Sequence, residues 1–231
     1  MVVNPALIRN LPYDSQRDLA PVSLLGWTGY VFAVAPDFPA RTMAEAVAVL
    51  RANPGRYSAG NPGIGTLAHL TTELFGQLVG TRVESVPYRG SGAALLDLST
   101  GRLGVMIDAM TSALPQVQGG RVRGLAVVQP TRSSLAPELP SMAEVGVPEL
   151  RDFQALAWVA MFGPTGLPEE VTGFWNREMN RWLVDPAFAA RFTAQNLEVA
   201  PPSPPSRLAE LVAADLVKWN KVARDANIEM Q

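Results

Sequence analysis

The sequence predicts an α/β fold in which a mainly parallel sheet carries helices on both faces. Short apolar runs rich in β-branched residues alternate with longer stretches whose apolar residues recur at helical spacing. Residues 34–126 form one complete small unit of this kind, predicted as lobe two. Residues 1–33 and 127–231 are expected to join as lobe one, with crossings near residues 32–34 and 127–128.

The first elements carry clear start and stop signals. Residues 30–34 are an apolar run and are predicted as a buried strand that ends before Pro36. Thr42 and Glu45 match the capping box that begins many helices. The predicted helix then stops at residues 53–55, an Asn-Pro-Gly turn.

The same alternation continues through the rest of the chain. Further strands are predicted at residues 56–60, 83–87, 105–108, 125–128 and 157–162. Helices are predicted at residues 4–6, 66–79, 92–100, 112–118, 169–183, 186–195 and 205–226. Proline-rich stretches at residues 131–148 and 201–205 are expected to be turns and a stiff linker.

Composition limits the possible functions. The chain has 231 residues, of which 48% are hydrophobic and 17% charged, so it can bury a core. A net charge of −2 argues against a nucleic-acid partner. Cysteine is absent and His69 is the single histidine, so the composition argues against a zinc site. The sequence contains no run of about 18 apolar residues, so it predicts no membrane span.

The strongest candidate site is the strand–loop–helix turn from Asn61 to Thr66. Gly63 and Gly65, which follow Pro62, allow the backbone to approach a ligand. Thr66 adds a hydroxyl and Asn61 adds an amide. The loop leads into a helix start, whose free N–H groups attract anions. The pattern suits a carboxylate or phosphate, and an ordinary tight turn explains it equally well. It is neither a P-loop nor a dinucleotide fingerprint.

Other candidates lie on the same predicted helix and at neighbouring strand ends. His69 can donate to an anion from the first turn of its helix, or act as a capping residue. Tyr88, Arg89 and Ser91 follow a second strand, where Tyr88 can wall a pocket. Arg89 can pair with an anion there, or lie exposed on the turn. Asp108 ends a third strand, where it can accept from a ligand or cap the next helix.

Several motifs follow one another along the chain: Asn4-Pro5-Ala6-Leu7, Leu11-Pro12-Tyr13-Asp14, Asp18 to Val22, Ala52 to Gly55, Asn61 to Thr66 with His69-Leu70, Val86 to Gly90, Pro140 to Gly146, Phe162 to Gly166 and Lys218 to Ile228. In this order they resemble the Bug family, the extracytoplasmic receptors of tripartite tricarboxylate transporters. Together they cover nearly the whole chain. Asn61 stands where many members have serine.

The resemblance implies a periplasmic-binding-protein-like fold of type II, the two-lobed Venus flytrap, with no metal, no cofactor and no catalysis. It implies capture of a small carboxylated metabolite by two loops, delivery to membrane permease subunits, and a monomer in the periplasm. One gripping loop matches Asn61 to Thr66, and the match places His69, Tyr88, Arg89, Ser91 and Asp108 near the ligand.

The resemblance also implies that the chain begins inside the family pattern. The first ten residues are not a signal peptide, so lobe one is expected to be incomplete and the signal lost with the preceding segment. Two other functions stay open: a ligand-presenting sensor component, and an α/β enzyme that uses His69 and Asp108. The distance between these two side chains would separate the enzyme from the receptor.

Overall fold

The structure is a computed structural model that describes residues 1–226. The chain divides into two compact units: unit 1 is Met1–Trp27 with Trp158–Gln231, and unit 2 is Thr28–Ala157. The predicted lobe boundaries stay a prediction. Residues 227–231 of predicted lobe one, and Ile228 in its last motif, lie outside the described residues.

Unit 2 contains a sheet of five strands in the order β3-β2-β4-β1-β5. These strands are β1 (Leu19–Val34), β2 (Ser58–Asn61), β3 (Glu84–Pro87), β4 (Val105–Ala109) and β5 (Arg123–Val127). Strand β2 pairs in parallel with β3 and β4, whereas β1 is antiparallel to both β4 and β5. The mainly parallel sheet expected from the sequence is therefore mixed, because β1 runs against its neighbours.

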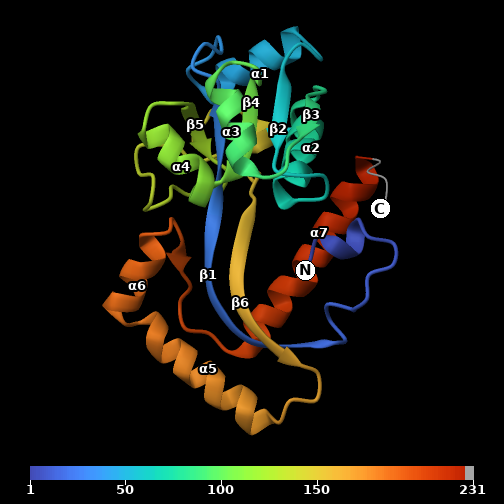
Figure 1. Ribbon diagram of the computed structural model, residues 1–231, viewed down its shortest axis with the longest axis vertical. Helices are drawn as coiled ribbons and strands as arrows, with labels where there is room; N and C mark the ends of the chain where they lie inside the picture. The colour runs from blue at the N-terminus through green and yellow to red at the C-terminus, as the bar shows by residue number, and fades with distance from the viewer. Residues whose placement is uncertain (227–231) are drawn as a thin grey trace. The chain divides into compact units, whose positions relative to one another are not determined.

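The α-helices of unit 2 accompany these strands (Figure 1). They are α1 (Met43–Ala52), α2 (Leu67–Val79), α3 (Ser91–Ser99) and α4 (Met110–Gln118). The capping box of α1 forms as predicted from Thr42 and Glu45. Thr66 caps the start of α2, and Gly80 ends it in the left-handed conformation. The short η2 (Pro148–Leu150), which was not predicted, begins at the last residue of the segment predicted as turns and packs on α2.

Aromatic rings occupy the middle of the unit 2 core. Phe32 on β1 and Phe75 on α2 are almost completely buried, with ring centroids 4.9 Å apart. The ring of Phe153 follows 6.1 Å from Phe75. This packing fixes α2, and therefore the loop before it, against the sheet.

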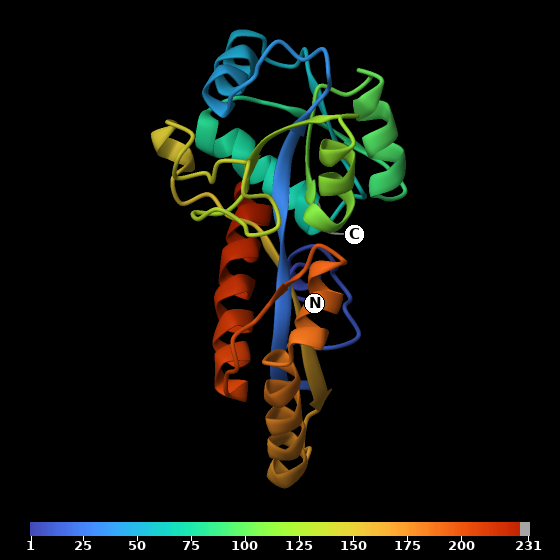
Figure 2. The ribbon, with the colours of Figure 1, turned by 90° about the vertical axis from the view of Figure 1, so that its left-hand side faces the viewer.

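Unit 1 contains the first part of β1, most of β6 (Leu156–Pro164) and the short β7 (Glu198–Val199). Its helices are η1 (Asn4–Ala6), α5 (Glu169–Leu183), α6 (Pro186–Thr193) and α7 (Pro205–Asp225). In Figure 2, α7 lies on one side of β1 and α6 on the other. Within residues 1–226, no helix is both long and apolar enough to cross a bilayer.

The main error of the sequence-based prediction concerns β1, which was expected only at residues 30–34 and begins at Leu19. Pro21, Gly26 and Gly29 interrupt the strand pattern in the sequence. Gly26 is required by packing, since an added Cβ would lie 2.3 Å from the backbone oxygen of Glu198 on β7. Strand β1 pairs with β6 and, at Gly26 and Trp27, with β7, which was not predicted. These pairings extend a strand that local propensity does not indicate.

Candidate functional site

The candidate site lies in unit 2, where three parallel strands end at the same edge of the sheet. Strands β3, β2 and β4 end at Pro87, Asn61 and Ala109, and each leads into a helix. The starts of α3, α2 and α4 are therefore brought to one edge. Helix starts carry unpaired N–H groups and a partial positive charge, so this edge favours anions.

Asn61 shapes the loop through its amide group. It is buried; its Oδ1 accepts from Gly63 N–H at 2.9 Å, and its Nδ2 donates to Ser85 Oγ at 2.8 Å. Its backbone oxygen accepts from Tyr88 N–H at 2.9 Å, and Pro62 oxygen accepts from Gly90 N–H at 3.1 Å. The loops that follow β2 and β3 are thus tied together, and the Asn61 side chain is used for this connection.

The glycines and Thr66 turn the chain into α2. Gly63 and Gly65 have φ of 147° and 79°, a region that disfavours other residues. Thr66 Oγ1 donates to Gly63 oxygen at 2.8 Å and accepts from His69 N–H at 3.3 Å. Within unit 2, no group accepts from the N–H of Leu67 or Ala68. These two donors at the helix start are available for an anion.

His69 differs from the anion donor considered in the sequence analysis. Its Nδ1 accepts from Gly65 N–H at 3.2 Å, and its Nε2 lies 3.7 Å from Glu73 Oε1. The ring is buried, and burial lowers its pKa from the ordinary value of 6.5. His69 therefore holds the loop through the Gly65 N–H. The sequence correctly places His69 in the first turn of the helix, but it does not indicate that the ring accepts from Gly65.

Tyr88 and Arg89 follow β3 as expected, and they behave differently. The Tyr88 hydroxyl donates to Asp97 Oδ2 at 2.9 Å on α3. Burial, with the Asp97 hydrogen bond second, raises the pKa of this phenol. Arg89 is exposed on the turn. Tyr88 thus joins its loop to α3, while the Arg89 guanidinium is accessible to solvent.

Ser91 and Asp108 come together between α3 and α4. Asp108 is buried at the end of β4 and accepts from Ser112 Oγ at 2.9 Å. Burial raises the pKa of Asp108, and interactions with Ser91 and Ser112 partly oppose this. The sequence missed Tyr30, a buried residue whose pKa is raised first by burial and then by the charge of Asp108. Only strand pairing brings Tyr30 close to Asp108.

Replacing Asp108 with asparagine is expected to raise the thermal midpoint at pH 7. The raised pKa means that the folded state prefers the protonated form, so ionised Asp108 destabilises the fold above that pKa. The gain should shrink as the pH falls through the raised pKa towards the ordinary value of 3.8. Calorimetry from pH 8 to pH 4 measures this, and an unchanged gain across the range would contradict it.

His69 and Asp108 belong to separate hydrogen-bond networks. The partners of His69 are Gly65, Thr66 and Glu73 on α2 and its loop. Asp108 is held by Ser112, with Ser91 nearby. The hydrogen bonds of unit 2 therefore do not join the two residues in a dyad. Residues 1–226 also contain no cluster of three or more His, Asp or Glu side chains that could hold a metal ion.

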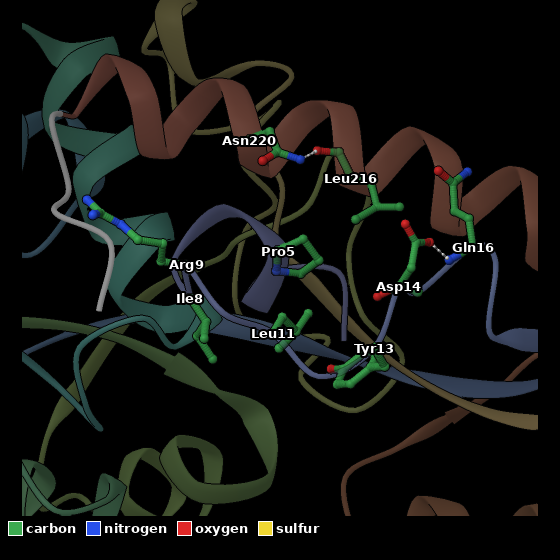
Figure 3. Close-up of a pocket in the computed structure, with 10 residues that line it drawn as sticks. Pro5, Ile8, Arg9, Leu11, Tyr13, Asp14, Gln16, Leu216 and Asn220 are labelled. Carbon is green, nitrogen blue, oxygen red and sulfur yellow. Dashed lines mark hydrogen bonds between the residues drawn. The ribbon is translucent and has the colours of Figure 1, made fainter.

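A hollow of about 380 Å³ lies in unit 1 between the N-terminal segment and α7 (Figure 3). Arg9 and Asp14, which line it, carry opposite charges, so it has no clear preference for an anion. Asp14 Oδ1 accepts from Gln16 N–H at 2.9 Å, and Asn220 Nδ2 donates to Leu216 oxygen at 2.7 Å. These polar groups are held within their own segments and do not converge on a ligand.

Two compact α/β units, one of which presents helix starts at a sheet edge, define the class of two-lobed periplasmic binding proteins. The model of the tripartite tricarboxylate transporter family receptor matches residues 1–228. The chain belongs to this receptor family. Receptors of the family are periplasmic solute-binding proteins and not enzymes.

Curated relatives support this assignment. BugT of Bordetella pertussis is 31% identical over 233 residues, covering 100% of this chain and 70% of BugT. A protein encoded between tcbD and tcbE in Pseudomonas sp. strain P51 is 33% identical over 223 residues, covering 96% of this chain. This chain covers 65% of that protein, so it spans about two thirds of such relatives.

Solved structures share the fold. Rpa4515 of R. palustris, solved with adipate, has a TM-score of 0.86 at 28% identity, with 100% of this chain and 76% of that chain covered. MatC of Rhodopseudomonas palustris, solved with malate, has a TM-score of 0.80 at 26% identity, with 95% and 74% covered. The periplasmic binding protein BugD gives 0.83 at 26% identity, with 100% and 76% covered.

Proposed function

We propose that this chain captures a small carboxylate in the periplasm, at the carboxyl edge of β3, β2 and β4, and passes it to membrane permease subunits. The observation that carries the proposal is the start of α2, where the N–H groups of Leu67 and Ala68 have no acceptor within unit 2. The loop Asn61 to Thr66 leads directly into these donors. The protein acts as a monomer and makes or breaks no bond.

The electrostatics of the edge favour one carboxylate at α2. The α2 dipole contributes positive potential there, whereas the buried carboxyl group of Asp108 already lies beside the starts of α3 and α4. A ligand carboxylate would therefore be repelled near Asp108 and attracted to α2. Asp108 would instead accept from a ligand hydroxyl, or lose its charge to a proton when a second ligand carboxylate approaches.

Each candidate residue has its own role in this proposal. Asn61, Pro62, Gly63, Gly65 and Thr66 shape the loop and expose its backbone. His69 and Tyr88 hold the loop in place, since each bonds to a loop backbone group. Arg89, which is exposed, attracts the anion from solvent. Ser91 keeps Asp108 oriented.

Two relatives suggest the size of the ligand. Rpa4515 was solved with adipate and MatC with malate, both dicarboxylates with short carbon chains. Over the aligned residues they are 28% and 26% identical to this chain, and the alignments cover 100% and 95% of it. Dicarboxylates of four to six carbons are therefore the first ligands to test, with tricarboxylates and aromatic carboxylates next.

A thermal-shift screen of the purified chain against these acids tests the proposal. A ligand at one hundred times its Kd stabilises the fold by about 2.7 kcal/mol. For a chain of this size that corresponds to a rise in Tm of roughly 5–10 °C. The matched control is the diamide of each acid, which keeps the shape and removes the charge. A folded protein that shifts with no acid, or equally with acid and diamide, contradicts the proposal.

A further inference from the structure

We propose that His69 is a positioning residue for ligand capture: its unprotonated Nδ1 holds the Gly65 N–H and fixes the loop before α2, so capture weakens when His69 gains a proton. The inference rests on the proposed function for its ligand consequence. The state of the ring itself is testable without any ligand.

The hydrogen bonds assign the tautomer. Gly65 N–H can only donate, so Nδ1 at 3.2 Å must present its lone pair. The ring proton of neutral His69 therefore sits on Nε2, which faces Glu73 Oε1 at 3.7 Å. The imidazole thus spans from the loop to the next turn of α2. The backbone N–H of His69 donates to Thr66 Oγ1.

Protonation reverses one of these contacts. A second proton on Nδ1 would point at the Gly65 N–H, and two donors cannot share a hydrogen bond. Either the ring turns away or the peptide group of Gly65 rotates. Gly65 has φ of 79°, and glycine permits such a rotation at little cost. The loop that leads to the free donors of Leu67 and Ala68 would then lose its fixed shape.

Charged groups lie on α2 and on the elements packed against it. On its own helix, Glu73 faces Nε2, and burial raises the pKa of Glu73 while Arg82 partly opposes this. Among the elements packed on α2, β4 carries Asp108, β3 carries exposed Glu84, and η2 carries Glu149, which is paired with Arg51. Glu73 is the group in contact with the imidazole, so its titration must be separated from that of His69.

Burial and the acceptor role act in the same direction. A lowered pKa means that folding favours neutral His69, so its contribution is complete above 6.5 and is lost as the pH falls through the lowered pKa. The loop holds its ligand-binding shape when neutral His69 accepts from Gly65 N–H. Affinity should therefore fall as the pH falls through the lowered pKa of His69 in the folded chain, roughly fivefold to tenfold for one lost hydrogen bond.

Nitrogen NMR of the single imidazole gives the first test. Because His69 is the only histidine, ¹⁵N-histidine labelling of chain purified without a polyhistidine tag yields one unambiguous ring. The expected spectrum at pH 8 shows a proton on Nε2 and a bare Nδ1. The amide signal of Gly65 should move with the same midpoint as the ring. A proton on Nδ1, or a Gly65 amide that ignores the ring titration, overturns the inference.

Two substitutions separate positioning from simple packing. In His69→Asn, the amide oxygen occupies the δ position and still accepts from Gly65; in His69→Gln, it lies at the ε position and cannot. Adipate and malate are the probes, titrated from pH 8 to pH 5 by calorimetry. His69→Asn should bind within about threefold of the unmodified chain at pH 8, and His69→Gln should lose fivefold to tenfold.

The pH profiles complete the test. Protonation of the probe is common to all variants and cancels in the ratio of affinities. Relative to His69→Asn, the unmodified chain should weaken as the pH falls, and Glu73→Gln should leave that decline in place. Parallel profiles for the unmodified chain and His69→Asn overturn the inference. If neither acid binds, the proposed function fails for these probes, whereas the NMR result still decides the role of His69.

Discussion

Replacing Asn61 with aspartate is expected to lower the affinity for a carboxylate ligand by about two orders of magnitude. The substitution keeps the shape of the side chain, and Oδ1 still accepts from Gly63 N–H. It adds a negative charge beside the loop that we propose holds the ligand anion. Two like charges about 5 Å apart repel by about 3 kcal/mol at an effective dielectric constant of about 20. Isothermal calorimetry with the best acid from the screen measures the change.

Asn53→Asp is the matched control. Asn53 ends α1 in the same unit, and its side chain donates to Val49 oxygen at 2.9 Å. The same change of charge at this position should leave ligand affinity within about twofold, because salt screens a distant surface charge. If Asn61→Asp binds as tightly as Asn53→Asp, the carboxylate does not occupy this loop, and the assignment of the site is wrong.

The sequence indicated this loop because its signals are local. Gly63, Gly65 and Thr66 identify a strand-to-helix turn through backbone conformation and capping chemistry, which depend only on nearby residues. The predicted helix at residues 66–79 accordingly matches α2, Leu67–Val79, with Thr66 as its cap. Family resemblance then added what such a loop is used for.

The partners of the site residues were not predictable in the same way. Asn61 bonds to Ser85, which lies 24 residues later in the sequence, and Tyr30 approaches Asp108 only because β1 pairs with β4. For His69, the choice between donor and acceptor depends on which ring atom meets Gly65. Such contacts are fixed by tertiary packing, so residue type alone leaves both roles open.

A sensor component and a transport receptor would both hold the ligand at the proposed site. Family membership decides the class, a solute-binding receptor, because the family model matches residues 1–228. The separate networks of His69 and Asp108 agree with a binding role for this edge of the sheet. A receptor of this kind needs a rigid platform behind its loop, and in unit 2 that platform is the aromatic core under α2.

Replacing Phe75 with alanine is expected to destabilise unit 2 by about 3–5 kcal/mol. The ring is 1% exposed and lies between Phe32 and Phe153, so its removal leaves a cavity that rigid neighbours cannot fill. This loss is a large part of the ~5–15 kcal/mol that stabilises a typical domain. Phe174→Ala is the control, because Phe174 is 50% exposed on α5 and should cost well under 1 kcal/mol.

The distribution of tryptophan allows the two units to be followed separately. All five tryptophans, at positions 27, 158, 175, 182 and 219, belong to unit 1. Urea unfolding followed by tryptophan fluorescence reports on unit 1, and hydrogen exchange of residues 67–79 reports on α2 in unit 2. Phe75→Ala should accelerate exchange in α2 by at least a hundredfold, since each 1.4 kcal/mol is a factor of ten. An unchanged exchange rate in α2 would show that the aromatic core does not hold α2 and the loop before it in place.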